Sequence, residues 1–447
     1  MMMVDGGCYG FQQQQTRLRR GFGHRATKPM AKLTGGANNN KQQQTTINNN
    51  KPAFAEASAG GANNNNKMSN FVARINAELK GDKAIWAILV LLAIISLLGV
   101  YSATGTLAYR ATGGNTEWFL LKQGLILFFG LMLTYICHLV HYTRYSAWAP
   151  YAMAAVIPLL VLTLAMGTEI NDARRWLELP YLGLTFQTSD LAKLALVVYV
   201  ARAISSKQDY IDDWKSAFLP IIVPVLIICG LIAPADLSTA ALLFLTSMGM
   251  MFVGRVALKY IGSLIVGGLI VFAFLYILGD MFPDAIRVDT WSSRIRDFMG
   301  GEQREIYHQA VQSKIAIANG GWFGQGPGNS IQRYYLPSPH TDYIYAIICE
   351  EYGAIGGTLL VALYVFLFFR VTRLVTKSPK AFGAMMAMGL TILLVFQAMI
   401  NMAVAVDLVP VTGLTLPMVS SGGSSLVFTA IAFGAILSVS KYIESTT

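Results

Sequence analysis

The chain has 447 residues, of which 54% are apolar and only 13% are charged. So few charges cannot cover the surface of so apolar a chain in water, which excludes an ordinary soluble enzyme. The formal net charge is +10, but residues 1–83 carry +8 of it. Because the basic character belongs to one end of the chain, we expect no nucleic-acid partner. The cysteines form no CxxC pair and no disulfide framework: Cys8, Cys137, Cys229 and Cys349.

Residues 1–67 form a low-complexity tail with repeated Asn and Gln tracts. Such tracts cannot bury enough apolar surface to offset the entropy of the chain, so we expect a disordered cytoplasmic tail. Its arginines could touch anionic lipid headgroups, although a solvated tail is the simpler interpretation. From Met68 the composition becomes ordinary and amphipathic, which predicts a cytoplasmic juxtamembrane segment over 68–83. We hypothesise that Met68 is the authentic start and that the tail is not native.

Ten segments approach the roughly 20 apolar residues that a helix needs to cross the hydrocarbon core of a membrane. They are 84–103, 118–140, 147–166, 186–203, 217–233, 237–254, 260–279, 342–369, 382–405 and 423–442. These segments predict an all-α polytopic membrane domain of about ten transmembrane helices over residues 84–443.

The basic residues of the short loops predict the orientation of this domain. The loops expected outside carry three: Arg110, Arg174 and Arg175. The inner loops and the C-terminal end carry eleven: Arg144, Arg202, Lys207, Lys215, Arg255, Lys259, Arg370, Arg373, Lys377, Lys380 and Lys441. This bias predicts that both termini lie in the cytoplasm of a bacterium, with the chain in its inner membrane. One long outer loop, about 280–341, remains between the seventh and eighth spans.

Ionisable residues inside spans are costly and are functional candidates by default. Asp190 and Lys193 are three residues apart, so they share a helix face near the outer mouth. Lys193 could present its ammonium to a cavity, or Asp190 could cap the helix and form only a local ion pair. Glu350, Glu351 and Asp407 also occupy span positions, with Asp407 near a turn.

The segment 416–425, Leu-Pro-Met-Val-Ser-Ser-Gly-Gly-Ser-Ser, precedes the last span and includes Ser421. Backbone of this kind must be buried in protein or line a wet cavity, because lipid cannot satisfy its amides. We expect a broken helix start that faces the same outer cavity. The alternative is an ordinary helix N-terminus with serine caps.

The large outer loop mixes acids, bases, amides and aromatic residues. Residues 309–318 could form a short amphipathic helix at the membrane interface. The glycine-rich run 324–330 predicts a tight turn with free amide groups, but it follows no strand and matches no P-loop. The mixture suits a site for a polar headgroup attached to a lipid, with bases for phosphate, carboxylates for proton transfer and amides for sugars.

Four signatures carry a resemblance to a known family: ARRWLELPYLGLTFQTSDLAKLAL, PADLSTAALLFL, QSKIAIANGGWFGQGPGNSIQRYYLPSPHTDYIYAIICEEYG and PMVSSGGSSL. Over about residues 78–443 the chain resembles the SEDS (shape, elongation, division and sporulation) family of peptidoglycan glycosyltransferases. The run Gly-Pro-Gly-Asn-Ser-Ile-Gln is similar to the division branch, and the elongation branch usually carries a Gly-Thr-Gln version. The start of the first span is also similar to division members of the Bacteroidetes.

The resemblance implies a membrane cavity that opens outward beneath the large loop. It implies that the protein polymerises lipid II into β-1,4 glycan strands at the division septum, with inversion and release of undecaprenyl pyrophosphate. Implied partners are the growing glycan strand, membrane lipids, a class B penicillin-binding transpeptidase and other division membrane proteins. A lipid II flippase and a non-catalytic division scaffold remain alternatives. The key polar groups gather at one face and not near the midplane, which is atypical of a transporter.

An inverting transfer needs a base that takes the proton of the acceptor hydroxyl. The resemblance places the essential acid in the large loop, where this chain departs from the family pattern. Counted by the family's spacing from Gln312 and Ser313, the essential acid is Glu302, which we favour slightly. Counted from Arg294, it is Asp297. Glu305 also remains open.

The family's motifs imply further substrate-binding residues. Lys193, with Asp190 in the same motif, corresponds to the cavity lysine, and Arg174 and Arg175 are candidates to hold pyrophosphate charge. The others are Gln312, Ser313, Asn329, Gln332, His340, Asp342 and Ser421. His340, Thr341 and Asp342 would order the base of the loop, unless Asp342 only caps the eighth span. Arg175 could equally be an interfacial anchor beside Trp176. No metal-ligand spacing is present, so no cofactor is evident, although a divalent cation at the pyrophosphate stays open.

Overall fold

The computed structural model describes residues 80–105, 116–170, 173–179, 184–281, 294, 305–336 and 338–444. The chain divides into two units, 1–69 and 70–447, and the described residues all belong to the second. The predicted tail 1–67 and most of the predicted juxtamembrane segment 68–83 lie outside the described residues. Their predicted states therefore stay predictions.

Each of the ten predicted spans coincides with a helix. These helices are α2 (Lys83–Ala103), α4 (Thr116–Leu139), α5 (Tyr142–Met166), α6 (Thr188–Ser206), α7 (Leu219–Ile232), α8 (Leu237–Val253), α9 (Leu258–Met281), α12 (Ile344–Val375), α13 (Ala381–Ala405) and α14 (Gly423–Glu444). Among the described residues, seven helices are long and apolar enough to cross a membrane. Of the rest, α8 and the Leu258–Ile270 part of α9 are shorter apolar helices, and α6 carries three charged residues. The prediction of a helical polytopic membrane protein is confirmed.

Four shorter helical elements complete the set. A 3-10 helix, η1 (Gln208–Tyr210), and a π-helix, η2 (Trp214–Phe218), lead from α6 into α7. The large loop contains α11 (Glu305–Gly320) and the 3-10 helix η3 (Gln332–Tyr334). The helix expected over 309–318 is therefore present, and it is longer than predicted.

A small antiparallel sheet joins α5 to α6, and the sequence prediction contained no strand. Its strands are β1 (Thr168–Ile170), β2 (Ala173–Leu179) and β3 (Leu184–Gln187), in that order. Trp176 pairs with Thr168 on one side and with Gln187 on the other. The strands are too short for an alternating pattern to stand out between two apolar spans. Because β3 runs directly into α6, the sheet fixes where α6 begins.

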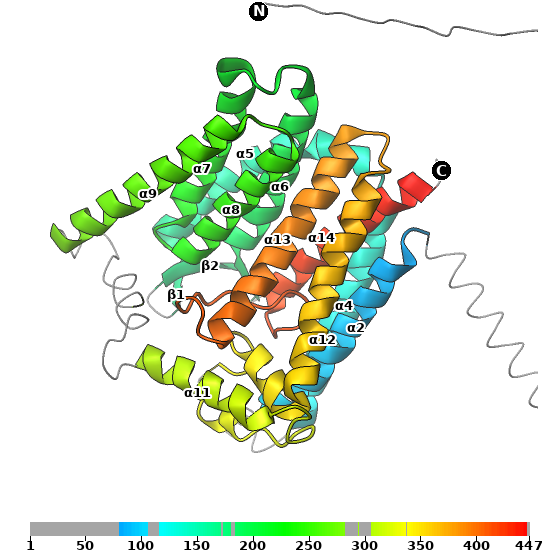
Figure 1. Cartoon of the computed structure of the whole chain (residues 1–447), viewed down its shortest axis with the longest axis vertical. Helices are drawn as coiled ribbons and strands as arrows, with labels where there is room; N and C mark the ends of the chain where they lie inside the picture. Colours follow the sequence, from blue (N-terminus) through cyan, green and yellow to red (C-terminus); the bar gives the residue numbers. More distant parts are fainter. Residues whose placement is uncertain are drawn as a thin grey trace, which may run out of the picture. The chain divides into compact units, whose positions relative to one another are not determined.

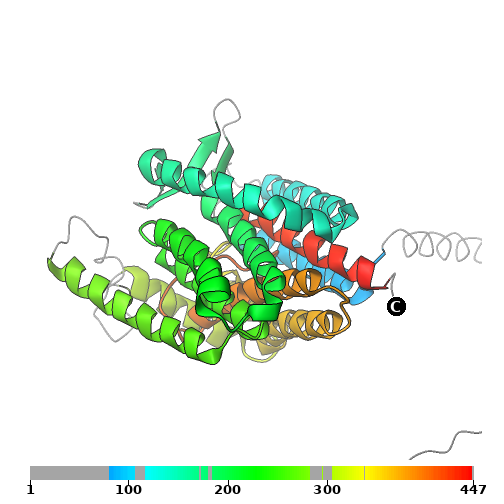
Figure 2. The same cartoon turned by 90° about the horizontal axis from the view of Figure 1, so that it is seen from above.

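The core is built around α13, which packs against α6, α8, α12 and α14. This helix is apolar on all sides, as expected for a buried helix. Small residues let its neighbours approach closely: a Cβ on Gly389 would lie under 3.0 Å from the Met250 side chain. Figure 2 shows α14 running between α4 and α13, in agreement with their contacts.

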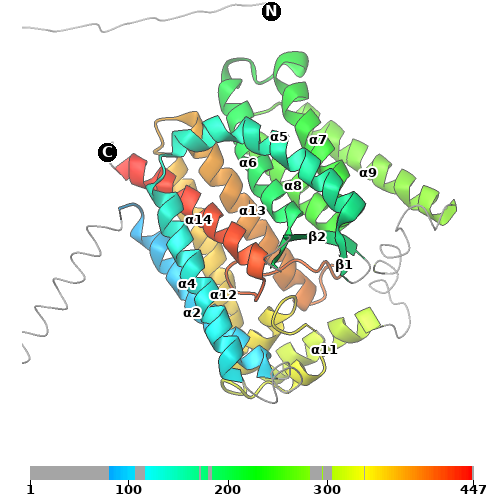
Figure 3. The same cartoon turned by 180° about the vertical axis from the view of Figure 1, so that it is seen from behind.

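The connecting segments of the helices divide between two ends (Figures 1 and 3). We call one the sheet end, because the sheet lies there with α11 and the irregular segment 406–422. The opposite end, called the turn end, carries the turns 207–213, 254–257 and 376–380. The helix α9 stands at the edge and packs against α8 (Figure 1). The loops that were predicted to face outside thus lie together at the sheet end.

Candidate active site

A cavity of about 340 Å³ lies at the sheet end, between α8, α13 and the segment that follows α13. Its polar wall contains Arg175, Asp236 and Arg294. Its apolar wall is formed by aliphatic side chains and a proline: Leu242, Leu245, Ile400, Val409, Pro410 and Leu414. A cavity that joins guanidinium groups to an aliphatic wall suits a ligand with an anionic head and a hydrocarbon tail.

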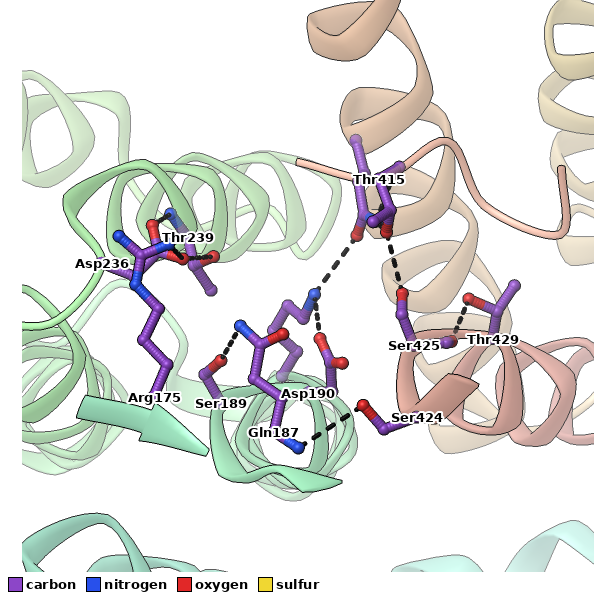
Figure 4. A network of polar contacts seen from close by, with 12 residues as sticks. Arg175, Gln187, Ser189, Asp190, Asp236, Thr239, Thr415, Ser424, Ser425 and Thr429 are labelled. Atoms are coloured by element: carbon purple, nitrogen blue, oxygen red, sulfur yellow. Dashed lines mark hydrogen bonds and ion pairs between the residues drawn. The ribbon is translucent and has the colours of Figure 1, made fainter. Parts of the chain in front are cut away.

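Arg175 on β2 is held at this cavity by contacts with the start of α8. Its Nε donates to the Ala235 carbonyl at 2.7 Å. Its guanidinium also pairs with Asp236 at 3.3 Å (Figure 4). Asp236 caps α8 by accepting from the Thr239 amide at 3.0 Å and from its hydroxyl at 2.9 Å. The Arg175 side chain stays 26% exposed, so an anion in the cavity can still reach it.

Arg294 and Asp342 add a second cation and a second acid to this region. Arg294 donates to the Val411 carbonyl at 3.2 Å. Burial and the nearby Arg175 lower the pKa of Arg294, and Asp236 and Asp342 oppose this shift. Burial raises the pKa of Asp342 to about 6, although Arg294 and Arg175 pull it down. The groups therefore interact across one site, where two cations are balanced by two acids.

Lys193 and Asp190 form a separate buried pair in the first turns of α6. Lys193 Nζ lies 2.7 Å from Asp190 Oδ1 and 3.4 Å from Gln397 Oε1. The pair lines a hollow of about 20 Å³, which is room for roughly one water molecule. Gln397 donates to the Thr415 carbonyl at 2.8 Å, and the Thr415 hydroxyl lies 2.9 Å from that of Ser425 (Figure 4). In this arrangement the ammonium of Lys193 links α6 to α13 and does not line the 340 Å³ cavity.

Two helix-cap alternatives from the sequence are wrong. The N-cap of α6 is Gln187, which makes no side-chain cap bond, so Asp190 is not the cap. The N-cap of α12 is Tyr343, which likewise makes none, so Asp342 does not cap that helix. The Gln187 side chain instead donates to the Ser189 hydroxyl at 2.9 Å (Figure 4). The carboxylates of Asp190 and Asp342 are therefore left for interactions other than helix capping.

The glycine-rich turn after α11 inserts into a break in α12. The break lies at Gly353, whose φ of 68° and ψ of −170° interrupt the helix. The Glu350 and Glu351 carbonyls accept from the amides of Gln325 at 2.9 Å and Gly326 at 3.0 Å. This exchange satisfies backbone groups that a broken helix would otherwise leave unpaired at the membrane boundary.

Asn329 and Gln332 lie in the segment that this exchange positions. The Glu350 carboxylate accepts from the Ser330 hydroxyl and from the Gln332 amide, so it caps η3. Gln332 is buried, and its Oε1 has no hydrogen-bond partner among the described residues. Asn329 is exposed and donates to the Gln325 carbonyl at 3.0 Å. Asn329 therefore faces solvent, whereas Gln332 faces the interior.

The base of the large loop is tied to the irregular segment before α14. The Ser421 amide donates to the His340 carbonyl at 2.9 Å, and the Ser420 hydroxyl donates to the Thr341 carbonyl at 2.5 Å. Asn401 on α13 donates to the Asp342 carbonyl at 2.9 Å. The segment is irregular until α14 begins at Gly423. These bonds bring His340, Asp342 and Ser421 together through their backbones.

Ser313 anchors α11, and neither Ser313 nor Gln312 lines the 340 Å³ cavity. The buried Ser313 hydroxyl donates to the Ala405 carbonyl at 2.7 Å, at the end of α13. Gln312 Nε2 lies 3.4 Å from His308 Nε2. The residue after Ser313, Lys314, pairs with Asp407 at 2.6 Å. The helix is thus fastened across the end of α13.

Both favoured catalytic acids, Glu302 and Asp297, lie outside the described residues. Glu305 is the first residue of α11, and its side chain is not described. Arg174 pairs through its backbone with Glu169 in the sheet, and its side chain is also outside the description.

Sequence reasoning assigned no role to four residues that the structure places at the cavity or in the separate network around Lys193. Asp236 is part of the quoted signature PADLSTAALLFL, to which no role was given. Arg294 was used only as the position from which Asp297 was counted. Gln397 and Thr415 gave no signal, because single polar residues in or near an apolar helix are common. Only the packing of α13 against α6 brings Gln397 to Lys193.

The fold and the cavity together define a polytopic membrane protein with a charged, partly aliphatic cavity at one end of its helices. Residues 82–445 match the profile of the family described as cell cycle proteins FtsW, RodA and SpoVE. The chain belongs to this family, the SEDS family that its signatures resemble.

Curated relatives and solved structures agree with this membership. The probable peptidoglycan glycosyltransferase FtsW of Trichlorobacter lovleyi is 33% identical over 370 residues, covering 81% of this chain and 94% of the relative. Stage V sporulation protein E of Bacillus subtilis is 33% identical over 369 residues, covering 81% and 97%. A chain from a peptidoglycan synthase complex that coordinates polymerization and crosslinking aligns with a TM-score of 0.64 at 27% identity, covering 81% and 98%. RodA of Thermus thermophilus aligns with a TM-score of 0.58 at 25% identity, covering 80% of this chain and 96% of the RodA chain.

Proposed function

We propose that the chain is a peptidoglycan glycosyltransferase of the division branch, which polymerises lipid II into β-1,4 glycan strands. The observation that carries the proposal is the 340 Å³ cavity, where Arg175 and Arg294 meet an aliphatic wall. Lipid II is an amphiphile in which a pyrophosphate joins a sugar-peptide head to a polyprenyl chain. The activity is the one named for the curated FtsW relatives.

The proposed orientation places the sheet end outside the cell and both termini inside. Lipid II would then enter the cavity from the outer leaflet, and the product would leave on the side where the cell wall is built. The basic loop residues support this orientation, since they lie in the turns at the turn end, which include 207–213, 254–257 and 376–380, or in the helix ends beside those turns.

The reaction would transfer the growing strand from its pyrophosphate to the sugar hydroxyl of the next lipid II. A loop carboxylate, Glu302 or Asp297, takes the proton of the attacking hydroxyl. The glycosidic C–O bond forms with inversion as the bond to the departing undecaprenyl pyrophosphate breaks. The guanidinium groups of Arg175 and Arg294 stabilise the negative charge that develops on the leaving group. Both carboxylates lie in the chain between Arg294, which lines the cavity, and α11.

A divalent cation at the pyrophosphate is not needed for this assignment. The described ranges contain no cluster of three or more His, Cys, Asp or Glu residues that could hold a metal ion. Asp236 at the cavity already accepts from Arg175 and Thr239. We therefore route no step through a metal ion.

The partner proposed for this activity is a class B transpeptidase, which would cross-link the strands as they form. The structural neighbour from a complex that coordinates polymerization and crosslinking supports this pairing. The recruitment of further division proteins rests on the division-branch signature alone.

Polymerisation of lipid II by the purified protein, alone and with its transpeptidase, tests the proposal. Glu302→Gln and Asp297→Asn each remove one candidate base without changing side-chain size much. We expect the variant of the true base to lose about 10²–10⁴-fold in rate, and the other to stay active. Glu117→Gln, which alters an exposed acid at the start of α4, is the matched control. Normal polymerisation by both loop variants would sink the catalytic assignment, and an inactive wild-type complex would sink the function.

A further inference from the structure

A second cavity, of about 190 Å³, lies at the turn end, far along the helices from the candidate active site. Two connections, the α4–α5 turn and the α12–α13 turn, meet the C-terminal part of α14 there (Figure 3). Its lining residues are His141, Tyr142, Ser378, Pro379, Lys380, Val439, Tyr442 and Ile443. The glycosyltransferase chemistry proposed above makes no use of this cavity.

One wall of this cavity is a stack of aromatic rings. The His141 ring lies 4.8 Å from the Tyr142 ring and 3.9 Å from the Tyr442 ring, centroid to centroid. The Thr143 amide donates to His141 Nδ1 at 3.2 Å. Because Nδ1 accepts this bond, the ring proton of neutral His141 sits on Nε2. The stack therefore gives the cavity a rigid wall that includes a fixed hydrogen-bond donor.

Positive charge surrounds the same wall. Burial lowers the pKa of His141, and the charges of Lys380, Arg144 and Lys441 lower it further. Lys380 lines the cavity, Arg144 lies in the first turn of α5 beside the lining residue Tyr142, and Lys441 Nζ lies 5.6 Å from the centroid of the Tyr442 ring. The ion pairs of the described residues use other bases: Arg175, Lys193, Lys314 and Arg370. Three cations therefore lie in or beside the cavity, and none of them forms an ion pair with a described carboxylate.

Two helices also begin at the cavity. The first residue of α5 is Tyr142, and the first residue of α13 is Ala381, next to the lining residue Lys380. The start of α13 has no side-chain cap, so its first amides remain available to an anion. Helix starts add partial positive charge to the three bases. Val439 and Ile443 give the cavity an apolar side where it meets the helices.

We propose that this cavity binds a phosphate-ester anion, supplied by the headgroup of an anionic membrane lipid or by a soluble phosphate. Three cations, a fixed imidazole donor and an uncapped helix start match the oxygen atoms of one phosphate group. The proposal is independent of the polymerase activity, because none of its groups belongs to the candidate active site.

Native mass spectrometry of the full chain with added lipid tests the proposal. The probes are phosphatidylglycerol, zwitterionic phosphatidylcholine and inorganic phosphate, each added to protein freed of lipid in detergent. The test variant is Arg144→Gln, Lys380→Gln and Lys441→Gln combined. Its matched control removes three bases elsewhere at the turn end: Lys215→Gln, Arg255→Gln and Lys259→Gln combined.

We expect phosphatidylglycerol to bind in preference to phosphatidylcholine, with affinity at least about tenfold lower in the test variant and nearly unchanged in the control. Competition by millimolar inorganic phosphate would assign the site to a soluble ligand, and its failure would assign the site to a lipid. Ser378→Trp fills the cavity without changing charge and should also weaken binding. Thermal unfolding of each variant checks that it folds. Equal phosphatidylglycerol and phosphate binding by the folded test variant and the control would overturn the proposal.

Discussion

At the scale of single residues, several costly charges of the described helices are engaged in ion pairs. Lys193 pairs with Asp190, Arg175 pairs with Asp236, and Lys314 pairs with Asp407. The sequence identified Lys193 as a candidate, because charges at span positions are costly, and Arg175 through the family motif. It also indicated the local pair of Lys193 with Asp190, three residues away on α6. It could not identify Asp236 as the partner of Arg175, since a partner far away in the chain is chosen by packing.

The buried pair of α6 gives a prediction about stability. Lys193→Met leaves the Asp190 carboxylate buried and unpaired, which should cost about 3–5 kcal/mol. The double variant Lys193→Met/Asp190→Leu removes both charges and should recover most of that loss. Thermal unfolding in detergent measures both, with Lys122→Met, at an exposed position of α4, as the control. A stable double variant that cannot polymerise lipid II would assign Lys193 a role in the reaction, whereas a fully stable Lys193→Met would contradict the pairing.

Asp342 gives a prediction about pH. Its folded pKa is about 6, above the ordinary value of 3.8, so the folded state holds a proton that the unfolded state releases. Stability from this group is present below about pH 4, is lost as the pH rises through about 6, and is constant above that. Asp342→Asn should therefore match the wild type near pH 4 and exceed it above pH 6, by roughly 1–2 kcal/mol after allowing for partial exposure. Thermal unfolding at the two pH values checks this, and an equal difference at both would contradict it.

At the scale of elements, the sequence predicted ten helices by hydrophobicity and one amphipathic helix in the large loop. It did not predict the three-stranded sheet or the break in α12. The break depends on hydrogen bonds that two segments exchange. One segment is α12 around Gly353, and the other is the glycine-rich turn after α11. The Ala354 amide donates to the Gly321 carbonyl at 2.8 Å, while Gly326 donates to Glu351. The sequence of neither segment, taken alone, predicts these hydrogen bonds.

Gly353→Ala tests the exchange. Its φ of 68° disfavours any residue with a Cβ, and that atom would lie under 3.0 Å from the Trp322 carbonyl. We expect a loss of at least about 2 kcal/mol and faster proteolysis of the loop 321–336. Gly230→Ala on α7 is the matched control, since its Cβ would meet nothing within 4 Å. If thermal unfolding does not separate the two variants, the break is not held by this contact.

At the scale of the whole membrane domain, the two ends of the helices carry connecting segments of different chemistry. The sheet end gathers the cavity, α11 and the broken start of α14, and the turn end gathers the basic turns and the second cavity. The asymmetry agrees with the orientation proposed from the basic residues.

Cysteine labelling tests the orientation. In a variant freed of its four native cysteines, Asn329→Cys places a thiol at an exposed position of the sheet end, and Lys377→Cys places one at the turn end. A membrane-impermeant maleimide added to spheroplasts should label the first and reach the second only after lysis. The reverse pattern would invert the proposed topology.

The sequence alone determined the class of this protein, because crossing a membrane demands long apolar helices and leaves a clear pattern. It also determined the family, because the local signatures are dense enough to be specific. Only the tertiary structure decided that Asp236 holds Arg175, that Gln397 meets Lys193 and that a cavity of about 190 Å³ lies between two turns and the end of α14. Those relations join residues far apart in the chain, and packing of all-round apolar helices leaves no periodic trace of which faces meet.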